Sequence, residues 1–321
     1  MNISENLYVL SLRDVNKTPA MCCVVELEDI IINNFNGQLI SLGTEIKTNG
    51  VLFVAAISMH DLVNSLMQVP VSEFRAIYAY VFDAFISPLE LTRPQWRNAI
   101  SRRHRTIRKI THLFIPFRQS VNDFSELFQI PVSYIPLASN VVDFGGYESS
   151  KIIDVNGYGR QPPELTKLLS ERFNKRESKR VYAHTNHAGI SAIHDFYQHR
   201  RLFWKLLRKS RIALLFDALH TPLDRNFPFS FVPQRMFESA AAGCVIVGKR
   251  PICSEIDELF NWSDHFIELP DRPVEMIDFI EHLLDNYDLE SAGRRNYEEC
   301  LRRHDWRHRI NEVIKIAGLA D

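Results

Sequence analysis

The chain has 321 residues, of which 45% are hydrophobic and 24% charged, with 38 basic and 39 acidic side chains. At roughly 100 to 200 residues per domain this length indicates two domains, and the near-neutral charge excludes a whole-chain polycation. The longest apolar run, Val51 to Met59, is far shorter than the roughly 20 residues that span a bilayer, and no basic apolar leader opens the chain. These features predict a cytoplasmic protein whose anion sites are local patches.

Cysteine and histidine patterns give no sign of a metal site. The five cysteines are an odd number without a C-x-x-C pair, and none of the twelve histidines lies in an H-E-x-x-H pattern. We therefore expect small buried cysteines, solvated or buried histidines, no metal and no cofactor.

Short apolar runs alternate with segments of helical period, which is typical of parallel sheets covered by helices. In the first half of the chain the predicted strands are Leu7 to Leu12, Val51 to Ile57, Arg75 to Phe82, Leu113 to Ile115 and Val132 to Ile135. Apolar residues recur at helical spacing from Trp96 to Ile110, and Pro94 suits a first turn, so Pro94 to Ile110 is predicted as a helix.

A polar stretch from Asn140 to Lys151 interrupts the apolar pattern and is the best candidate for a domain boundary. The predicted parts are residues 1–145, residues 146–304 and a terminal helix within residues 305–321. In the second part the predicted strands are Lys151 to Val155, Arg180 to His184, Arg211 to Asp217, Cys244 to Gly248 and His265 to Glu268. The predicted helices are Pro163 to Phe173, Ile190 to Lys209, Pro233 to Ala242, Pro273 to Asn286 and Asp305 to Ala317, the last with Asp305 as N-cap. Two doubly wound, Rossmann-like α/β domains are the simplest architecture, and ligands of such sheets bind beyond the carboxyl ends of the strands.

The segment from Phe231 to Gly248, FVPQRMFESAAAGCVIVG, is the most informative one. Arg235 and Glu238 are three residues apart, so they are neighbours near the start of the predicted helix, where backbone N–H groups favour an anion. A carboxylate beside such a site can accept hydrogen bonds from the two hydroxyls of a ribose. An ordinary surface pair of arginine and glutamate explains the spacing equally well.

This segment resembles the donor-binding signature of group 1 glycosyltransferases with the GT-B fold, in the branch where R-x-x-E precedes small residues, a glycine and a strand. Residues 111–144 are similar to the end of that family's first domain, where two strands flank a short helix and lead into a linker. Residues 305–318 are similar to its closing helix, which crosses back to the first domain. The resemblance implies a nucleotide-sugar donor.

The resemblance also implies roles for the residues at matching positions. Glu238 would hold the donor ribose, and Arg235 would support the diphosphate side of the pocket. Arg160, in the G-Y-G-R turn after a predicted strand, would neutralise diphosphate charge. Lys249 follows another strand at the same edge of the sheet, although a solvated loop lysine is the more frequent case.

His184, with Thr185 and Asn186, ends a strand next to the expected base pocket and has side-chain atoms that can hydrogen-bond a nucleotide base. A polar turn explains these residues equally well. One departure concerns Ser230, because the family usually carries a glutamate eight positions before the one that Glu238 matches. Asp224 and Arg225 are possible substitutes for its contact with the donor sugar, and retention or inversion of the anomeric centre stays open.

In the first domain His60 and Asp83 follow predicted strands and are candidates for the base that deprotonates an acceptor hydroxyl. Helix N-caps are the alternative explanation for Asp83 and for Asp61, which follows His60. The family's glycine-rich loop after the first strand is missing, since Leu12 is followed by RDVNKT.

The predicted helix from Pro94 to Ile110 is strongly basic. Basic residues beside its apolar stripe favour contact with an anionic membrane surface or a lipid diphosphate, although a solvated helix face is the more frequent case. The residues concerned are Arg97, Arg102, Arg103, Arg105, Arg108 and Lys109. No RRM or KH motif accompanies them, so nucleic acid is not an expected partner.

The sequence thus predicts a glycosyltransferase that moves a sugar from a nucleotide-diphosphate donor to a glycan or lipid-linked acceptor without a metal. Its expected location is the cytoplasm, with a peripheral location at the inner membrane face as the alternative. A catalytically silent nucleotide-sugar-binding protein is the alternative from another class, and an epimerase or hydrolase on a related fold is a second enzymatic alternative.

Overall fold

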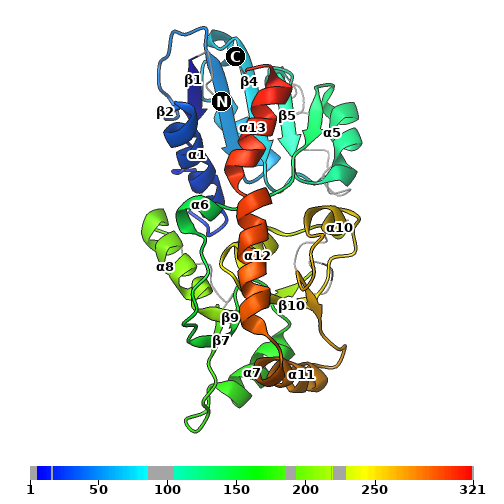
Figure 1. Ribbon diagram of the computed structural model, residues 1–321. Coiled ribbons are helices and arrows are strands. Elements are labelled where there is room, and N and C mark those ends of the chain that lie inside the picture. Colours follow the sequence, from blue (N-terminus) through cyan, green and yellow to red (C-terminus); the bar gives the residue numbers. More distant parts are fainter. Residues whose placement is uncertain are drawn as a thin grey trace. The chain divides into compact units, whose positions relative to one another are not determined.

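A computed structural model of the chain describes residues 6–15, 17–85, 105–185, 193–217, 219 and 229–319. The chain divides into two compact units, each built around a parallel sheet (Figure 1). Unit 1 comprises Met1–Leu137, Ser191–Phe196 and Trp306–Asp321, and unit 2 comprises Ala138–Ile190 and Tyr197–Asp305. The predicted architecture of two α/β domains with parallel sheets is confirmed.

The sheet of unit 1 has the strand order β2-β1-β3-β4-β5-β6, and all its pairs are parallel. Its strands are β1 (Leu7–Leu10), β2 (Gln38–Ile40), β3 (Val51–Ala56), β4 (Ala76–Val81), β5 (His112–Ile115) and β6 (Val132–Tyr134). Every residue of β3 and β4 is buried, because helices cover both faces of a parallel sheet. The short β2 was not predicted, since two of its three residues are exposed and it forms no apolar run.

The helices of unit 1 begin with a buried one that the sequence analysis missed. They are α1 (Met21–Phe35), α2 (Met59–Leu66), α5 (Val121–Phe128) and α13 (Trp306–Ala317), with short 3-10 turns at Val71–Glu73 and Arg118–Ser120. In α1 nearly every residue from Met21 to Ile31 is buried, so no polar face marks its period. Glu28 is fully buried as well. Its Oε2 accepts a hydrogen bond from Nε of Arg13 at 2.7 Å, and burial raises the pKa of Glu28.

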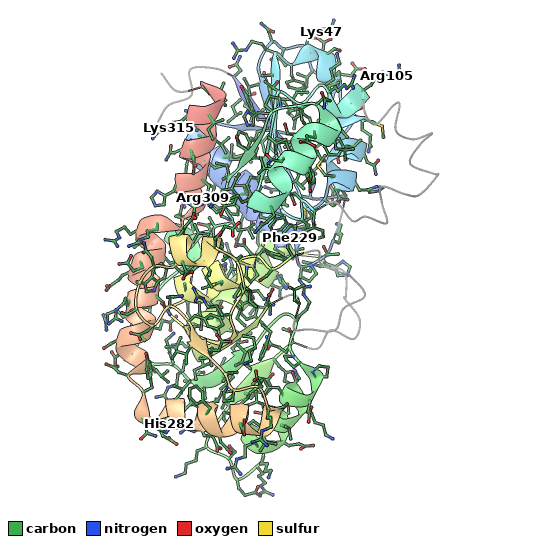
Figure 2. All side chains as sticks on the ribbon, turned by 90° about the vertical axis from the view of Figure 1, so that its right-hand side faces the viewer. Lys47, Arg105, Phe229, His282, Arg309 and Lys315 are labelled. Carbon is green, nitrogen blue, oxygen red and sulfur yellow. The ribbon has the colours of Figure 1, made fainter. Side chains whose placement is uncertain are left out.

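The C-terminal helix α13 packs in unit 1, as predicted for a helix that crosses back to the first domain. The indole ring of Trp306 lies edge-on to the rings of Tyr80 and Phe82, with centroid distances of 5.4 Å to each. Near the other end of the helix, the hydroxyl of Tyr78 donates to the carbonyl of Ala317 at 3.0 Å. Arg309, marked in Figure 2, donates from Nε to the carbonyl of Pro136. These contacts fix the last helix on the first sheet.

The sheet of unit 2 has the strand order β11-β10-β9-β7-β8 and is also parallel throughout. Its strands are β7 (Ile153–Gly157), β8 (Tyr182–His184), β9 (Ser210–Phe216), β10 (Val245–Lys249) and β11 (Ile267–Glu268). All strands predicted for this part of the chain are present, with shifted ends.

The helices of unit 2 cover the two faces of this sheet. They are α6 (Val141–Phe144), α7 (Pro163–Phe173), α8 (Phe196–Arg208), α9 (Gln234–Ala241), α10 (Glu255–Leu259), α11 (Pro273–Asn286) and α12 (Leu289–Arg303). Leu169 of α7 and Ile280 of α11 share one core with alternate strand residues such as Leu214. The helices α9 and α12 pack together, and both contact β9 and β10.

Helix α12 was not predicted, because its buried residues are small or polar rather than large and apolar. Gly293 is one of them, and a Cβ atom there would lie 2.4 Å from the carbonyl oxygen of Gly243, so only glycine permits this approach. Asn296 is fully buried, where it donates to the carbonyl of Cys244 and accepts from the indole N–H of Trp262. None of the described helices is both long and apolar enough to cross a bilayer.

The two units meet in sequence between Leu137 and Ala138, whereas the predicted boundary followed residue 145. The polar segment after Ala138 is bound to unit 2 through its backbone. Gly146 donates to the carbonyl of Ala241 at 2.9 Å, and Val142 donates to the carboxylate of Asp305, also at 2.9 Å. The polar segment from Asn140 to Lys151 therefore belongs to unit 2, and its lack of an apolar pattern does not mark the boundary itself.

Candidate functional site

The carboxyl edge of the unit 2 sheet gathers the residues that follow its parallel strands. Strand β7 is flanked by β8 on one side and β9 on the other, so the chain reverses its direction of travel across the sheet between β7 and β9. At such a switch point the loops after the two strands part, and open α/β sheets bind their ligands there. The turn after β7 and residue Asp217 after β9 lie at this position.

Arg235, the second residue of α9, spans the switch point. Its Nη1 donates to the carbonyls of Tyr158 at 3.3 Å and Arg160 at 2.9 Å, and its Nη2 donates to the carbonyl of Phe216 at 3.2 Å. Burial lowers the pKa of Arg235 to about 10, which still leaves it cationic at neutral pH. A positive charge is thus fixed at the start of α9, between the ends of β7 and β9.

The turn after β7 is shaped to admit this guanidinium. Gly159 has a φ of 71°, and a Cβ atom there would lie 2.7 Å from Cδ of Arg235, so a side chain is excluded on both counts. The hydroxyl of Tyr158 donates to the carbonyl of Arg235 at 2.8 Å and lies 3.0 Å from the hydroxyl of Ser239. The G-Y-G-R turn therefore holds α9 against β7, with half-buried Arg160 next to Gly159.

Glu238 lies one helical turn after Arg235 and is also buried. Its Oε1 accepts a hydrogen bond from Nη2 of Arg200, on α8, at 2.7 Å. The guanidinium of Arg200 in turn lies over the rings of Phe203 and Trp204, 4.5 and 5.4 Å from their centroids. Sequence reasoning singled out Glu238 but missed Arg200, which is remote in sequence and has no motif around it.

Ser230 is connected to a carboxylate that the sequence analysis did not consider for the site. Its hydroxyl donates to Oδ2 of Asp217 at 2.6 Å and accepts from the backbone N–H of Ile252 at 2.7 Å. Asp217 follows β9 and is fully buried, and among the described residues no hydrogen-bond donor reaches its Oδ1. An acid directly after the apolar strand IALLF was the available signal. Asp224 and Arg225, the predicted substitutes, lie outside the described residues.

A hollow of about 630 Å³ opens beside this pair, at the end of β10. It is lined by residues 249–254, by Ile256 and Asp257 of α10, by Glu268 of β11 and by Asp271. Lys249 is the last residue of β10, and its ammonium donates to the carbonyl of Leu269 and to Asp271, both at 2.7 Å. The predicted phosphate ligand Lys249 therefore lies at a hollow, but with an acidic partner.

His184 ends β8 and is exposed, with its ring stacked on that of Tyr182 at 5.2 Å. The hydroxyl of the next residue, Thr185, accepts from the backbone N–H of Gly159 at 3.1 Å, which connects the ends of β7 and β8. Asn186 lies outside the described residues. His184 thus belongs to the same sheet edge as the turn at Gly159.

The two candidate bases lie in unit 1, after the neighbouring strands β3 and β4. His60 is exposed in α2, and its Nε2 lies 2.7 Å from Nδ2 of Asn64. Ser58 caps this helix, since its hydroxyl accepts from the backbone N–H of Asp61, so Asp61 is not the N-cap. Asp83 is half-buried, and its backbone N–H donates to the carbonyl of Ile57 at 2.7 Å.

The basic segment of unit 1 is described only from residue 105 onward, and Arg97, Arg102 and Arg103 lie outside that part. The side chains of Arg105, Arg108 and Lys109 are exposed, and Figure 2 shows Arg105 at the surface of unit 1. Ile107 and Ile110 are 4% and 2% exposed, so their side of the segment packs into the core.

Comparisons with known proteins identify the class. Residues 167–315 match the sequence family described as Glycosyl transferase-like, and a comparison with curated proteins gave no match. The fold resembles that of Anabaena HepE in complex with UDP and glucose, over 98% of this chain and 100% of that one, with 9% identity and a TM-score of 0.59. It also resembles sucrose-phosphate synthase from Thermosynechococcus elongatus, over 98% of each chain, with 6% identity and a TM-score of 0.53.

A further similarity involves a longer protein. This is the pneumococcal O-GlcNAc transferase GtfA, solved in complex with UDP and GlcNAc. The similarity covers 84% of this chain but only 57% of GtfA, with 9% identity and a TM-score of 0.43. At identities below 10%, the two structures with TM-scores above 0.5 show the fold alone, which is GT-B. Residues 167–315 match the Glycosyl transferase-like family, and the chain as a whole has the fold of GT-B glycosyltransferases, which supports the resemblance to the group 1 family.

Proposed function

We propose that this glycosyltransferase takes its sugar from a nucleotide-diphosphate donor bound at the carboxyl edge of the unit 2 sheet, and passes it to a glycan or lipid-linked acceptor. The observation that carries the proposal is the placement of Arg235 at the switch point between β7 and β9. A fixed cation at a helix start, between two strand ends, suits a diphosphate. The UDP in the HepE complex, on the same fold, supports a nucleotide ligand.

Arg235 retains donors for such a ligand. A guanidinium has five N–H groups, and two of those of Arg235 have no hydrogen-bond partner among the described residues. Arg160, which follows Gly159, and Lys249, at the end of β10, add positive charge along the same edge. These groups stabilise the leaving diphosphate as its charge develops, so the proposed transfer proceeds without a metal. Unchanged turnover after treatment with a chelator is the matching expectation.

We assign the donor ribose to Glu238, with Arg200 as a positioning residue. The ion pair to Arg200 compensates the buried charge of Glu238 and orients its carboxylate. His184, at the end of β8, is assigned to the base side of the same edge.

The transferred sugar is assigned to Asp217 and Ser230. A buried carboxylate oxygen without a donor is costly, and a sugar hydroxyl is a donor that would satisfy it, whereas a phosphate oxygen would repel it. Asp217 thus takes the part of the glutamate that the family has at position 230, and Ser230 fixes its orientation. If the reaction inverts the anomeric centre, His60 or Asp83 serves as the base for the acceptor hydroxyl.

A thermal-shift screen of UDP, GDP, CDP, ADP and TDP tests the donor site, because a ligand that binds the folded state raises the apparent Tm. The nucleotide found is then used as its sugar conjugate, with and without acceptor glycans, and the release of nucleoside diphosphate is measured. Glu238→Gln should weaken nucleotide binding, and Glu298→Gln, an exposed carboxylate on α12, is the matched control.

The outcomes separate the alternatives. Release that depends on an acceptor supports the transferase, and NMR of the product gives its anomeric configuration. Binding of the nucleotide sugar without any release supports a catalytically silent binding protein, which Ser230 at the usual glutamate position favours. Release without an acceptor indicates a hydrolase, and conversion of the bound sugar indicates an epimerase. No shift with any of the nucleotides contradicts the proposed donor site.

A further inference from the structure

Helix α8 exposes apolar side chains on the face that points away from its own unit. Tyr197, Leu202 and Leu206 are 47%, 54% and 54% exposed. Leu202 and Leu206 are four residues apart, so they are neighbours on the helix surface. Figure 1 shows α8 at the outer side of unit 2, on the left of the view.

The same face is basic. No aspartate or glutamate occurs from residue 196 to residue 211. Arg201 and Lys205 are exposed, lie between Tyr197 and the leucine pair around the helix, and have no acidic partner among the described residues. Asp195 precedes the first residue of the helix, and at the other end Glu148 pairs with Arg208 and Lys209 at 3.2 and 2.5 Å.

The orientation of the helix is fixed by its opposite face. Trp204 and Leu207 are 1% and 0% exposed, and Arg200 is held by Glu238. The leucine pair therefore cannot turn inward. Ile152 is a further exposed apolar residue near the end of the helix: its side chain is 67% exposed, and its backbone N–H donates to the carbonyl of Lys209 at 3.0 Å.

We propose that α8 is a membrane-contacting surface that lies in the headgroup region of an anionic bilayer. Leu202, Leu206 and Ile152 enter the boundary of the acyl chains, and Tyr197 lies at the headgroups, where aromatic side chains are enriched. Arg201 and Lys205 contact the lipid phosphates. An anionic bilayer is the partner that fits this surface, because the basic side chains of α8 match its negative headgroups and the two exposed leucines match its acyl chains.

The basic segment of unit 1, from Arg105 to Ile110, lacks the exposed apolar face that insertion into a bilayer requires. Its described basic residues are exposed, but Ile107 and Ile110 beside them are buried. Over its described part it offers charge without an apolar face, whereas α8 offers both. We therefore expect α8 to bind through both charge and apolar contact, and the unit 1 segment through charge alone.

Co-sedimentation of the full chain with vesicles of phosphatidylglycerol and phosphatidylcholine, without donor or acceptor, tests the proposal. Leu202→Ser/Leu206→Ser should lower the partition coefficient about tenfold or more, because two leucines lose their apolar contact. Arg201→Gln/Lys205→Gln should lower it about fivefold per charge on phosphatidylglycerol and hardly at all on pure phosphatidylcholine. High salt should remove this difference.

Two controls carry matched changes elsewhere on unit 2. Val274→Ser removes an apolar side chain that is 63% exposed on α11, and Lys167→Gln removes an exposed charge on α7. Both should bind vesicles as the unaltered chain does. All six positions changed in the α8 variants and the controls are exposed, so the circular dichroism of these variants should be unchanged.

Three results would overturn the proposal. One is absence of binding to phosphatidylglycerol vesicles. Another is full binding by the α8 variants together with loss of binding in Arg105→Gln/Arg108→Gln/Lys109→Gln, which would assign the contact to unit 1. The third is an oligomer in light scattering that Leu202→Ser/Leu206→Ser dissociates, which would make the face a protein interface. Because no step needs catalysis, the result is independent of the proposed donor site.

Discussion

Arg200 of α8 and Glu238 of α9 form an ion pair with 2.7 Å between Nη2 and Oε1, and their side chains are 7% and 5% exposed. The glutamate of the R-x-x-E motif is therefore not an isolated ligand on an open surface. Its charge is compensated inside the protein, so a substitution of either partner acts on the fold as well as on the proposed binding of the donor.

Removal of one partner should be strongly destabilising. Glu238→Ala leaves the Arg200 guanidinium buried without its carboxylate, so we expect the free energy of unfolding to fall by about 3 to 5 kcal/mol. Urea unfolding followed by circular dichroism measures it. The double variant Arg200→Met/Glu238→Met should recover most of the loss, because neither charge of the pair remains. Unaltered stability of Glu238→Ala would show that the pair does not form in solution.

Ser230 should be more important for stability than a loop serine usually is. In Ser230→Ala the carboxylate of Asp217 loses its described donor, and the N–H of Ile252 loses its acceptor. Each buried polar group left unpaired costs about 1 to 3 kcal/mol, so we expect a decrease in that range or somewhat above it. Ser170→Ala is the matched control, since that hydroxyl bonds to the Thr166 carbonyl of its own helix. Equal stability of the two variants would contradict the Asp217 contact.

Asp217 should discriminate between nucleotide sugar and nucleotide. If its free oxygen accepts a sugar hydroxyl, Asp217→Asn should weaken binding of the nucleotide sugar by about 1.5 to 3 kcal/mol, the range for hydrogen bonds to charged groups. Binding of the corresponding nucleoside diphosphate should change little. Calorimetry with both ligands measures the difference. An equal loss for both would assign Asp217 a structural role, whereas Glu238→Gln should weaken both in any case.

Arg160 and Arg235 should respond differently to replacement by methionine. The hydrogen bonds of Arg235 to three carbonyls make it part of the fold, so Arg235→Met should lower the Tm along with diphosphate affinity. Arg160→Met should lower affinity for the diphosphate but not for the nucleoside, because a charge-assisted contact needs the phosphate. The thermal shift and calorimetry of each variant test this. Unchanged diphosphate affinity in Arg160→Met would remove Arg160 from the site.

Most strands were predictable because parallel sheets bury both faces and leave continuous apolar runs, as in VLFVAA and AIYAYV. Two long helices were not. Helix α1 is buried nearly all round, which erases its period, and α12 buries Gly293, Asn296 and other small or polar residues, which no apolar pattern records. In both cases tertiary packing decides the structure, and a local pattern cannot report it.

The candidate site was predictable where it depends on one segment. Arg235 and Glu238 share a helix, so their spacing alone made them neighbours. Arg200 reaches Glu238 through the packing of α8, Asp217 contacts Ser230 instead, and neither Arg200 nor Asp217 carries a motif. The Ser230 to Asp217 contact bridges different loops in the same way. Sequence reasoning therefore found the residues of the motif and missed Arg200 and Asp217, which contact Glu238 and Ser230.

Cys253 offers a direct reporter of the hollow at the end of β10. It is partly exposed, whereas Cys22, Cys23, Cys244 and Cys300 are buried. Burial, with the charge of Glu255 as a smaller cause, raises the pKa of Cys253 to about 11. The thiolate is the reactive form. Its fraction is small at neutral pH and increases about tenfold for each unit by which the pH rises, as long as the pH stays below the pKa.

We therefore expect alkylation of Cys253 by iodoacetamide to be slow at pH 7 and about a hundredfold faster at pH 9, with the native circular dichroism retained. Mass spectrometry of peptides locates the modified residue, and Cys253→Ser should abolish the rapid modification. A donor nucleotide sugar that occupies the hollow should slow the reaction at pH 9, while a non-binding nucleotide should not. Fast labelling at pH 7 would contradict the raised pKa. Labelling that a bound donor leaves unchanged would place the donor away from the loop of residues 249–254, and the assignment of Lys249 to the diphosphate would then be wrong.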